Sequence, residues 1–572
     1  MLVLSSLLLL CAIVQTPIAK AIAGKTKLDP ETHRELLLSG RPQVGLWKSL
    51  LKEQKVQEER AALSSLEGGG PQRPFTAFGS NDNANAKGKT LFEAHCFPQK
   101  ISHLDDSVNG TFCQRYWIDA SYYKDGGPVF LLDGGETSGE DRVPFLEKGI
   151  LQILSNATNG IGIVLEHRYY GDSVPVQSFS TDDLRFLNNK EALADSAYFI
   201  ENFRAPSGIL SDVVQQQNAL HPNNTAWFYY GGSYAGARAA HMRKEYPHLV
   251  WGAIASSAVT HAQVNFPQYH DPIQRYAPEQ CITTLQEAIE FIDHLLDQPE
   301  PIPRYLKSMF GLEQLVGNDD FADVISGPLG YWQAKNWDPK VGSSEFYNFC
   351  DALTAGGAEH KLGLIRIPAS IMNYGKYIKE KVILRCPRTE GEPASDIEEC
   401  FGTSEDSKFR ETDLEQTWRL WIFQVCTQWG YFMPAPLEGP RIISNKLTLE
   451  YTSKICKQAF PPGKHFAVPE WPDVEEVNSR GDYEIEYDRL AFIDGDRDPW
   501  RPMTPQSDWA PRRKSSVNKP VHLIFDGVHH YDENGLADHT AEPPRIKDVH
   551  ELEINFVQEW IAQFQEEKVR RL

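Results

Sequence analysis

Short apolar runs bounded by glycine dominate the chain after about residue 75. Each run holds aliphatic, β-branched or aromatic residues between turn-forming residues, which is typical of a strand buried on both faces. Patterns with helical spacing separate the runs, so the sequence predicts parallel α/β units. The runs lie within 126–136, 160–171, 225–236, 489–496 and 520–527.

The middle of the chain has a different pattern. Helix-like spacing prevails over about 265–480, for example in 285–298 and 409–426, and the chain closes with an amphipathic helix predicted over 549–572. We therefore expect one α/β domain, formed by 76–265 and 481–572, that is interrupted by a mostly helical insertion over 266–480.

The N-terminal pattern predicts a secretory signal over residues 1–23. An apolar run from Leu2 to Val14 precedes small residues at Ala21 and Ala23, and a membrane-spanning helix needs about 20 apolar residues, more than this run supplies. We expect no membrane anchor. Residues 24–75 form an expected N-terminal extension, with an amphipathic helix over 46–66 before a GGGP break. A propeptide, a packing arm and a loosely attached surface segment all fit this extension.

Composition narrows the class of protein. Hydrophobic residues make up 41% of the chain and charged residues 24%, which excludes a wholly disordered protein. The 78 acidic residues outnumber the 57 basic ones and give a formal charge of −21. Because no basic field is present to attract phosphate backbones, we expect no nucleic-acid partner.

The cysteines and sequons agree with a secretory route. Eight cysteines remain after the signal, six of them in the insertion, and they allow up to four disulfides. No CxxC pair indicates zinc, and we expect neither a metal nor a cofactor. Sequons predict N-glycosylation at Asn109, Asn156 and Asn223.

One short segment carries the pattern of a nucleophile elbow. In YYGGSYAGA (229–237), an apolar strand runs into Ser233, and a helix-compatible stretch follows. A serine on a tight strand-to-helix turn needs small residues two positions before and after it, and Gly231 and Ala235 meet that need. Ala235 stands where glycine is usual. Taken alone, such a turn is more often structural than catalytic.

A base and an acid follow in the order that α/β-hydrolases use. Three aspartates, Asp494, Asp496 and Asp498, come after one predicted strand, and His529 and His530 come after the next. From the residues alone, any of the three aspartates fits. The acidic loop also fits a solvated or calcium-like turn, and the histidine pair also fits packing or a fragment of a metal site.

An oxyanion hole needs two backbone N–H groups. The residue after the serine, Tyr234, supplies one candidate, and Gly134 and Gly135 in the LLDGGE loop supply the other. An ordinary turn at the end of a strand explains that loop equally well.

Several strings together resemble one family of serine peptidases. The family contains lysosomal Pro-X carboxypeptidase, dipeptidyl-peptidase II and fungal acid prolyl endopeptidases. The strings are YYGGSYAGARAAHMRKEYPHLVWGAIASSA (229–258), GPVFLLDGGE (127–136), VLEHRYYGDSVP (164–175), EALADSAYFI (191–200), DRDPW (496–500) and VHH (528–530).

The resemblance implies an α/β-hydrolase fold with a large, mostly helical, disulfide-containing cap. It also implies that Ser233 is the nucleophile, Asp498 the orienting acid and His529 the general base, and that bonds are cut on the carboxyl side of proline through an acyl-enzyme. Asp494 and Asp496 then become loop residues.

Proline presents a ring and no N–H, so its pocket should be apolar and aromatic. The candidate substrate contacts are Trp421, Gln424, Gln428, Trp429, Tyr431 and Trp500, and core packing explains each aromatic residue equally well. Gln428 stands where the resembling family usually has glutamate. Glu166 and Arg168 are a candidate buried ion pair near the site.

Other classes and modes stay open at this stage. An α/β-hydrolase that acts on esters and a non-catalytic homologue would share the scaffold. Endopeptidase, carboxypeptidase and dipeptidyl-peptidase modes all fit, with peptides or proteins that contain proline as the expected partners. A homodimer is also open, as are secreted and lysosomal or vacuolar destinations.

Overall fold

The computed structural model describes residues 92–210, 218–362, 365–383 and 397–571. The predicted signal over 1–23 and the N-terminal extension over 24–75 lie outside the described residues. So do residues 76–91 of the expected first part of the α/β domain.

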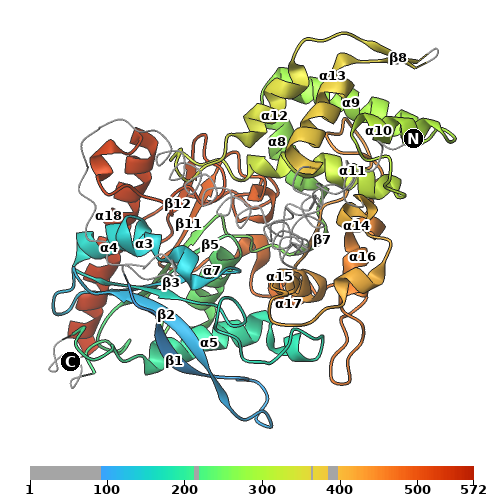
Figure 1. The fold of residues 1–572 in the computed structure, drawn as a ribbon. Coiled ribbons are helices and arrows are strands. Elements are labelled where there is room, and N and C mark those ends of the chain that lie inside the picture. Colours follow the sequence, from blue (N-terminus) through green and yellow to red (C-terminus); the bar gives the residue numbers. More distant parts are fainter. Residues whose placement is uncertain (1–91, 211–217, 363–364, 384–396, 572) are drawn as a thin grey trace, which may run out of the picture.

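An eight-stranded sheet forms the centre of the molecule (Figure 1). Its strand order is β1-β2-β4-β3-β5-β6-β11-β12. The pairs β1–β2 and β2–β4 are antiparallel, and the remaining neighbours are parallel. The strands are β1 (His95–Lys100), β2 (Thr111–Asp119), β3 (Val129–Asp133), β4 (Ile161–Leu165), β5 (Trp227–Gly232), β6 (Gly252–Ser256), β11 (Leu490–Gly495) and β12 (Val521–Ile524).

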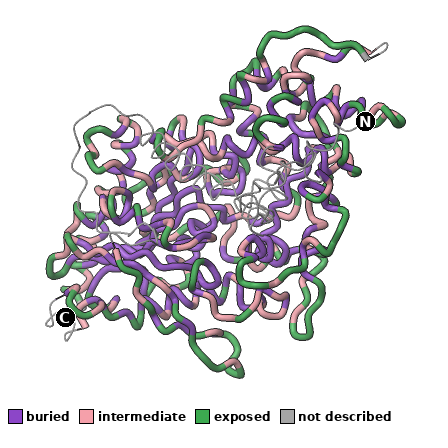
Figure 2. Tube along the Cα trace, in the orientation of Figure 1, coloured by how far each residue is buried: buried purple, intermediate pink, exposed green. Residues whose placement is uncertain are grey.

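All five apolar runs form strands, namely β3, β4, β5, β11 and β12, and the predicted α/β-hydrolase fold is confirmed. Helices cover both faces of the sheet. On one face, α3 (Pro144–Glu147), α4 (Ile150–Thr158) and α18 (Pro544–Arg571) share a hydrophobic core with Phe130 and Leu132 of β3. On the other, α5 (Asn189–Asn202) and α7 (Tyr234–Glu245) pack with Val129 and Leu131. Strands with two buried faces read as continuous apolar runs, and Figure 2 shows this burial.

The chain between β6 and β11 is mostly helical and lies beside the sheet (Figure 1). Two two-stranded sheets, β7 with β10 and β8 with β9, accompany the helices. The elements are β7 (Gln263–Asn265), α8 (Asp271–Tyr276), α9 (Glu279–Leu296), α10 (Ile302–Met309), α11 (Asn318–Ser326), α12 (Glu345–Thr354), β8 (His360–Leu362), β9 (Ile365–Ile367), α13 (Ala369–Tyr377), α14 (Ile397–Phe401), α15 (Trp418–Gln424), β10 (Gly430–Phe432), α16 (Leu449–Ala459) and α17 (Glu475–Asn478).

Three disulfides join described cysteines. Cys96–Cys113 links β1 to β2, and two more, Cys281–Cys350 and Cys426–Cys456, brace the helical insertion. Within the described ranges, none of the helices has the length and apolar character needed to cross a bilayer.

The helix predicted over 409–426 is shorter in the structure. Only Trp418–Gln424 is α-helical, as α15. The side chain of Asp413 accepts a hydrogen bond from the Glu415 N–H at 3.0 Å and another from the Gln416 amide at 2.7 Å. Such local bonds compete with helix formation, so the prediction was wrong for the first half of this segment.

Candidate active site

Ser233 lies at the turn between β5 and α7. Its backbone has φ 61° and ψ −122°, a conformation that is rare for residues other than glycine. The Ser233 N–H donates to the Ser256 carbonyl at 2.9 Å. A Cβ on Gly231 would lie 2.0 Å from the Ala235 carbonyl oxygen, so this position requires glycine. The sequence therefore folds locally as a tight strand-to-helix turn with a serine at its apex.

Asp498 and His529 contact each other at the carboxyl ends of two neighbouring strands, β11 and β12. The Nδ1 atom of His529 lies 2.9 Å from Oδ2 of Asp498, which is fully buried. The other Asp498 oxygen accepts the Trp500 N–H at 2.9 Å. An aspartate that holds one ring nitrogen of a histidine fixes the tautomer whose other nitrogen can act as a base.

The other two aspartates face elsewhere. Asp494 accepts hydrogen bonds from Thr504 at 2.8 Å and from the Gln506 side chain at 2.9 Å. Asp496 lies 3.9 Å from Arg497 and interacts with the backbone of Asp526. Asp498 is thus the aspartate of this loop whose carboxylate meets a histidine.

The charges of the pair support a neutral, basic imidazole. Burial alone would raise the pKa of Asp498, but the His529 ring, the Ser257 hydroxyl and the Trp500 N–H together lower it. Burial lowers the pKa of His529, Asp498 opposes that shift, and the neighbouring His530 adds to it. The pKa of His529 is therefore below that of an ordinary imidazole, which favours the uncharged ring.

Ser257 and His530 link this pair to the nucleophile turn. Sequence reasoning gave Ser257 no role and considered His530 only as the second member of the candidate histidine pair. The Ser257 hydroxyl contacts Asp498 and accepts the His530 N–H at 2.9 Å. The His530 ring lies 3.2 Å from where a Cβ on Gly232 would stand. Within the described residues, no hydrogen bond joins the Ser233 hydroxyl to His529. In free enzymes such contacts often form only when substrate binds.

The two glycines predicted for the oxyanion hole have other acceptors. The Gly134 N–H donates to the Leu165 carbonyl at 2.8 Å, and the Gly135 N–H donates to Asp133 Oδ1 at 3.0 Å. Both expected donors therefore have acceptors within the protein: Gly134 donates to β4, and Gly135 donates to the aspartate at the end of β3. In the part of the chain that the structure describes, the N–H groups of Glu136 and Tyr234 have no acceptor.

The predicted aromatic residues gather around Tyr234 and His529. The Tyr234 ring packs edge-on against Trp421, with centroids 5.4 Å apart, and against Trp429, 5.0 Å apart. The Trp500 ring lies 6.3 Å from His529 and 5.1 Å from Tyr431. These side chains are almost fully buried, with exposed fractions of 8% for Trp421 and 5% for Trp500.

The two glutamines of this segment make contacts within the protein. Gln424 accepts a hydrogen bond from the Tyr170 hydroxyl at 2.6 Å. Gln428 accepts the Asn189 N–H at 2.9 Å, at the start of α5. Gln428 thus holds a helix end rather than facing Ser233.

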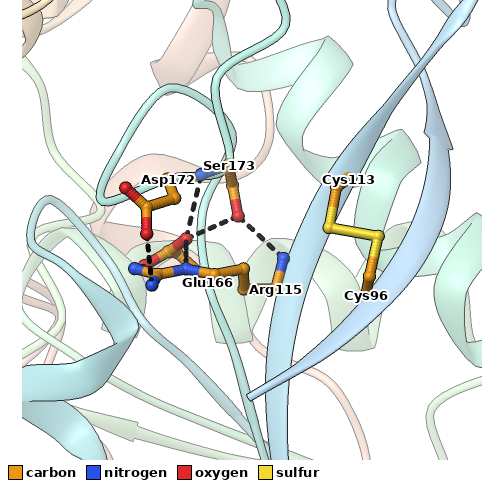
Figure 3. Close-up of a disulfide and its surroundings, with 6 residues drawn as sticks. All are labelled: Cys96, Cys113, Arg115, Glu166, Asp172 and Ser173. Atoms are coloured by element: carbon orange, nitrogen blue, oxygen red, sulfur yellow. Dashed lines mark hydrogen bonds and ion pairs between the residues drawn. A yellow bond between two sulfur atoms is a disulfide. The ribbon is translucent and has the colours of Figure 1, made fainter.

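The expected pair of Glu166 with Arg168 is wrong. Glu166 binds Arg115 with an Nη2–Oε1 distance of 2.7 Å and also accepts the Ser173 hydroxyl at 2.6 Å (Figure 3). Arg168 instead pairs with Asp195, at 2.6 Å. Glu166 and Arg168 lie two residues apart across a turn and point to different neighbours. Their ion pairs with Arg115 and Asp195 hold the loops around the site in place.

No group of three histidine, cysteine, aspartate or glutamate side chains that could hold a metal ion is found among the described residues. The described residues thus form a nucleophile-like turn beside an aspartate-bound histidine.

Comparisons with known proteins show the family to which the chain belongs. A family model described as "Serine carboxypeptidase S28" matches residues 99–552. A protein of Arthroderma benhamiae described as "Probable extracellular serine carboxypeptidase" is 40% identical over 504 residues, which cover 82% of this chain and 68% of that protein. The human "Thymus-specific serine protease" is 27% identical over 429 residues, 71% of this chain and 76% of that one. With its fold and with most of its length matched, the chain belongs to the S28 family of serine carboxypeptidases.

Proposed function

We propose that this peptidase acts through Ser233, His529 and Asp498 and cuts peptide bonds on the carboxyl side of proline. The observation that carries the proposal is the 2.9 Å contact between His529 and the buried Asp498, in loops that lie against the Ser233 turn. The residue order, nucleophile, acid and then base, is the one that α/β-hydrolases use.

The proposed reaction has two steps. His529 takes the proton of the Ser233 hydroxyl as its oxygen attacks the peptide carbonyl, and then gives that proton to the leaving amine. Asp498 stabilises the imidazolium that forms in between. Water, activated by the same histidine, then attacks the acyl-enzyme and releases Ser233.

The oxyanion is received by backbone donors. Tyr234 is the first residue of α7, so its N–H points out of a helix N-terminus, where negative charge is stabilised. The second donor is the Glu136 N–H, because Gly134 and Gly135 donate within the protein. The loop lies close enough for this: a Cβ on Gly135 would be 3.4 Å from that of Ala235.

The aromatic surroundings support proline as the residue before the cut. Trp421 and Trp500 each keep a small exposed fraction beside the nucleophile turn and the base. A proline ring gains from apolar contact and needs no acceptor for an N–H. Ester hydrolysis on the same scaffold is the alternative that a substrate comparison separates.

We also propose that the protein enters the secretory pathway and is glycosylated. The apolar N-terminal run and the name of the Arthroderma relative support secretion. Asn109, Asn156 and Asn223 are all exposed, as glycan attachment requires.

The test uses one peptide with a single internal proline and free ends, incubated at mildly acidic pH. Mass spectrometry should find cleavage only after proline, and the Ser233→Ala variant should leave the peptide intact. The fragment masses give the mode of attack. If the peptide stays intact while a short ester is hydrolysed rapidly, the protein acts as an esterase and the proposed peptidase function is wrong.

A further inference from the structure

The two backbone donors of the proposed oxyanion hole come from separate elements. The Tyr234 N–H belongs to the first turn of α7, and the Glu136 N–H belongs to the loop that follows β3, the β3 loop. Catalytic groups must be held within about 0.5 Å of the geometry that the reaction needs. The fold must therefore fix the β3 loop relative to α7.

Asp133, the last residue of β3, has one oxygen bound to the β3 loop. Its Oδ1 accepts the Gly135 N–H, two residues further on, at 3.0 Å. Gly135 has a φ of 65°, in the left-handed region that glycine adopts without steric cost. An aspartate side chain that binds the backbone two residues later forms a local turn. This turn sets the course of the chain into Glu136.

The other oxygen of Asp133 is bound to α7 and β5. Oδ2 lies 3.2 Å from Nη2 of Arg238 and accepts the Tyr229 hydroxyl at 2.6 Å. Tyr229 is the donor, because burial and the charge of Asp133 raise the pKa of its hydroxyl. Asp133 is 5% exposed, so water can hardly replace either partner. The carboxylate is thus held from both sides in one orientation.

Arg238 lies on the helix that carries the first donor. It comes four residues after Tyr234 on the same face of α7, and its guanidinium carbon stands 5.7 Å from the centre of the Tyr234 ring. Nη2 also donates to the Ala192 carbonyl at 2.9 Å and to the Ser196 hydroxyl at 3.2 Å, both on α5. The ion pair of Arg238 with Asp133 therefore joins the β3 loop to α7 and α5.

Stability alone does not explain this ion pair. Taking two charges out of water is costly, and apolar residues of similar size often stabilise a core as well as a buried ion pair does. Within the described chain, Nε and Nη1 of Arg238 have no hydrogen-bond partner, so the cost is only partly offset. Charged hydrogen bonds do, however, impose a direction that apolar packing does not.

We propose that Asp133 and Arg238 are positioning residues that hold the β3 loop against α7, so that the N–H groups of Glu136 and Tyr234 face the same oxyanion. This inference rests on the proposed function and names the pair of side chains that sets its oxyanion hole. Both residues act through the backbone, without touching the substrate. Their loss should slow the chemical step and leave substrate binding nearly unchanged.

The experiment compares an N-acylproline methyl ester with its thionoester, in which sulfur replaces the carbonyl oxygen. Sulfur is larger and accepts hydrogen bonds more weakly, so a well-formed oxyanion hole favours the oxygen ester in kcat/KM. A general loss of structure would slow both esters alike. The ratio of the two kcat/KM values therefore reports on the oxyanion hole itself.

Three variants of the full chain are compared with the wild type, and thermal unfolding shows that each one folds. Asp133→Asn keeps the size of the side chain and removes the charge that binds Arg238. Tyr229→Phe is milder, because it removes one hydroxyl and no charge. Asp195→Asn is the matched control: Asp195 is also buried and pairs with Arg168 at 2.6 Å, and none of its hydrogen bonds within the described residues reaches the β3 loop.

In Asp133→Asn, the ester-to-thionoester ratio should fall by at least about 10-fold, while KM for the oxygen ester stays within about twofold of the wild-type value. Tyr229→Phe should lower the ratio in the same direction, by about two- to fivefold. Asp195→Asn should leave the ratio unchanged.

A wild-type ratio in folded Asp133→Asn would overturn the proposal, and if that variant does not fold, a wild-type ratio in Tyr229→Phe would do so. An equal fall of the ratio in Asp195→Asn would also overturn it, since the loss of any nearby ion pair would then have the same effect. Failure of the wild type to cut a proline peptide, or ester hydrolysis that persists in Ser233→Ala, would instead refute the proposed function.

Discussion

At the scale of single residues, Asp494 stands out because it is a buried acid four positions before Asp498. One oxygen accepts hydrogen bonds from Thr504 and Gln506, and the other has no partner among the described residues. Burial raises the pKa of Asp494 to about 7, and the nearby negative charge of Asp498 adds to the shift. The neutral acid is therefore the form that this site accommodates.

The sign of its effect on stability follows from that shift. A carboxyl group whose pKa is higher in the folded state stabilises the fold at low pH, and this contribution is lost as the pH rises from about 4 through about 7. Asp494→Asn keeps the shape and carries no charge. We expect the variant to be more stable than the wild type at about pH 8, by about 2–4 kcal/mol, and to differ little at about pH 4.

Urea unfolding at the two pH values measures this difference. Asp106→Asn, which changes an exposed aspartate, is the control and should leave the pH dependence unchanged. An Asp494→Asn protein that loses stability at about pH 8 as steeply as the wild type would show that Asp494 ionises without cost.

At the scale of elements, the insertion reaches back to hold a helix of the α/β domain. Gln428 follows α15 and accepts the Asn189 N–H at the beginning of α5, where backbone donors lack partners within the helix. Its exposed fraction is 8%, so water can hardly replace it. The role of Gln428 is thus structural in this fold.

Gln428→Ala should lower the free energy of unfolding by about 1–3 kcal/mol, because a buried N–H loses its acceptor. The KM for a proline peptide should stay unchanged. Trp421→Ala, in contrast, removes a ring that packs on Tyr234 and should raise KM. Thermal unfolding combined with steady-state kinetics distinguishes the two variants. A raised KM in folded Gln428→Ala would show that Gln428 contributes to substrate binding.

The strands of the sheet also show which elements a sequence pattern predicts and which it does not. Runs buried on both faces, such as Val129–Asp133, can be predicted from the sequence because every residue but the last is apolar. The strand Thr111–Asp119, which lies between β1 and β4, mixes exposed and buried positions. Gly252–Ser256 is built mostly from small residues, so neither segment carries a strong strand pattern. Motif order indicated Ser233, an aspartate among three and a histidine of the 529–530 pair, and only the family resemblance singled out Asp498 and His529. The contacts of Ser257 with Asp498 and His530 join segments far apart in the chain, and no local pattern encodes them.

At the scale of the whole molecule, the helical insertion braces the two loops that carry the proposed acid and base. The Trp332 indole donates to the Arg497 carbonyl at 2.9 Å, and the Trp500 indole donates to the Gln333 side chain at 2.8 Å. The Trp337 indole donates to the Tyr531 carbonyl at 2.8 Å. One segment of the insertion thus holds the loop of Asp498 and the loop of His529 together.

The most direct test of this account is covalent labelling with a fluorophosphonate, followed by peptide mapping. Such a reagent reacts with a serine only where a base activates it and an oxyanion hole receives the phosphonyl oxygen. The account predicts one label per chain, on Ser233, with labelling greatly slowed in His529→Ala and in Asp498→Asn. A label on another serine, or labelling of Ser233 that is indifferent to the loss of His529, would contradict it.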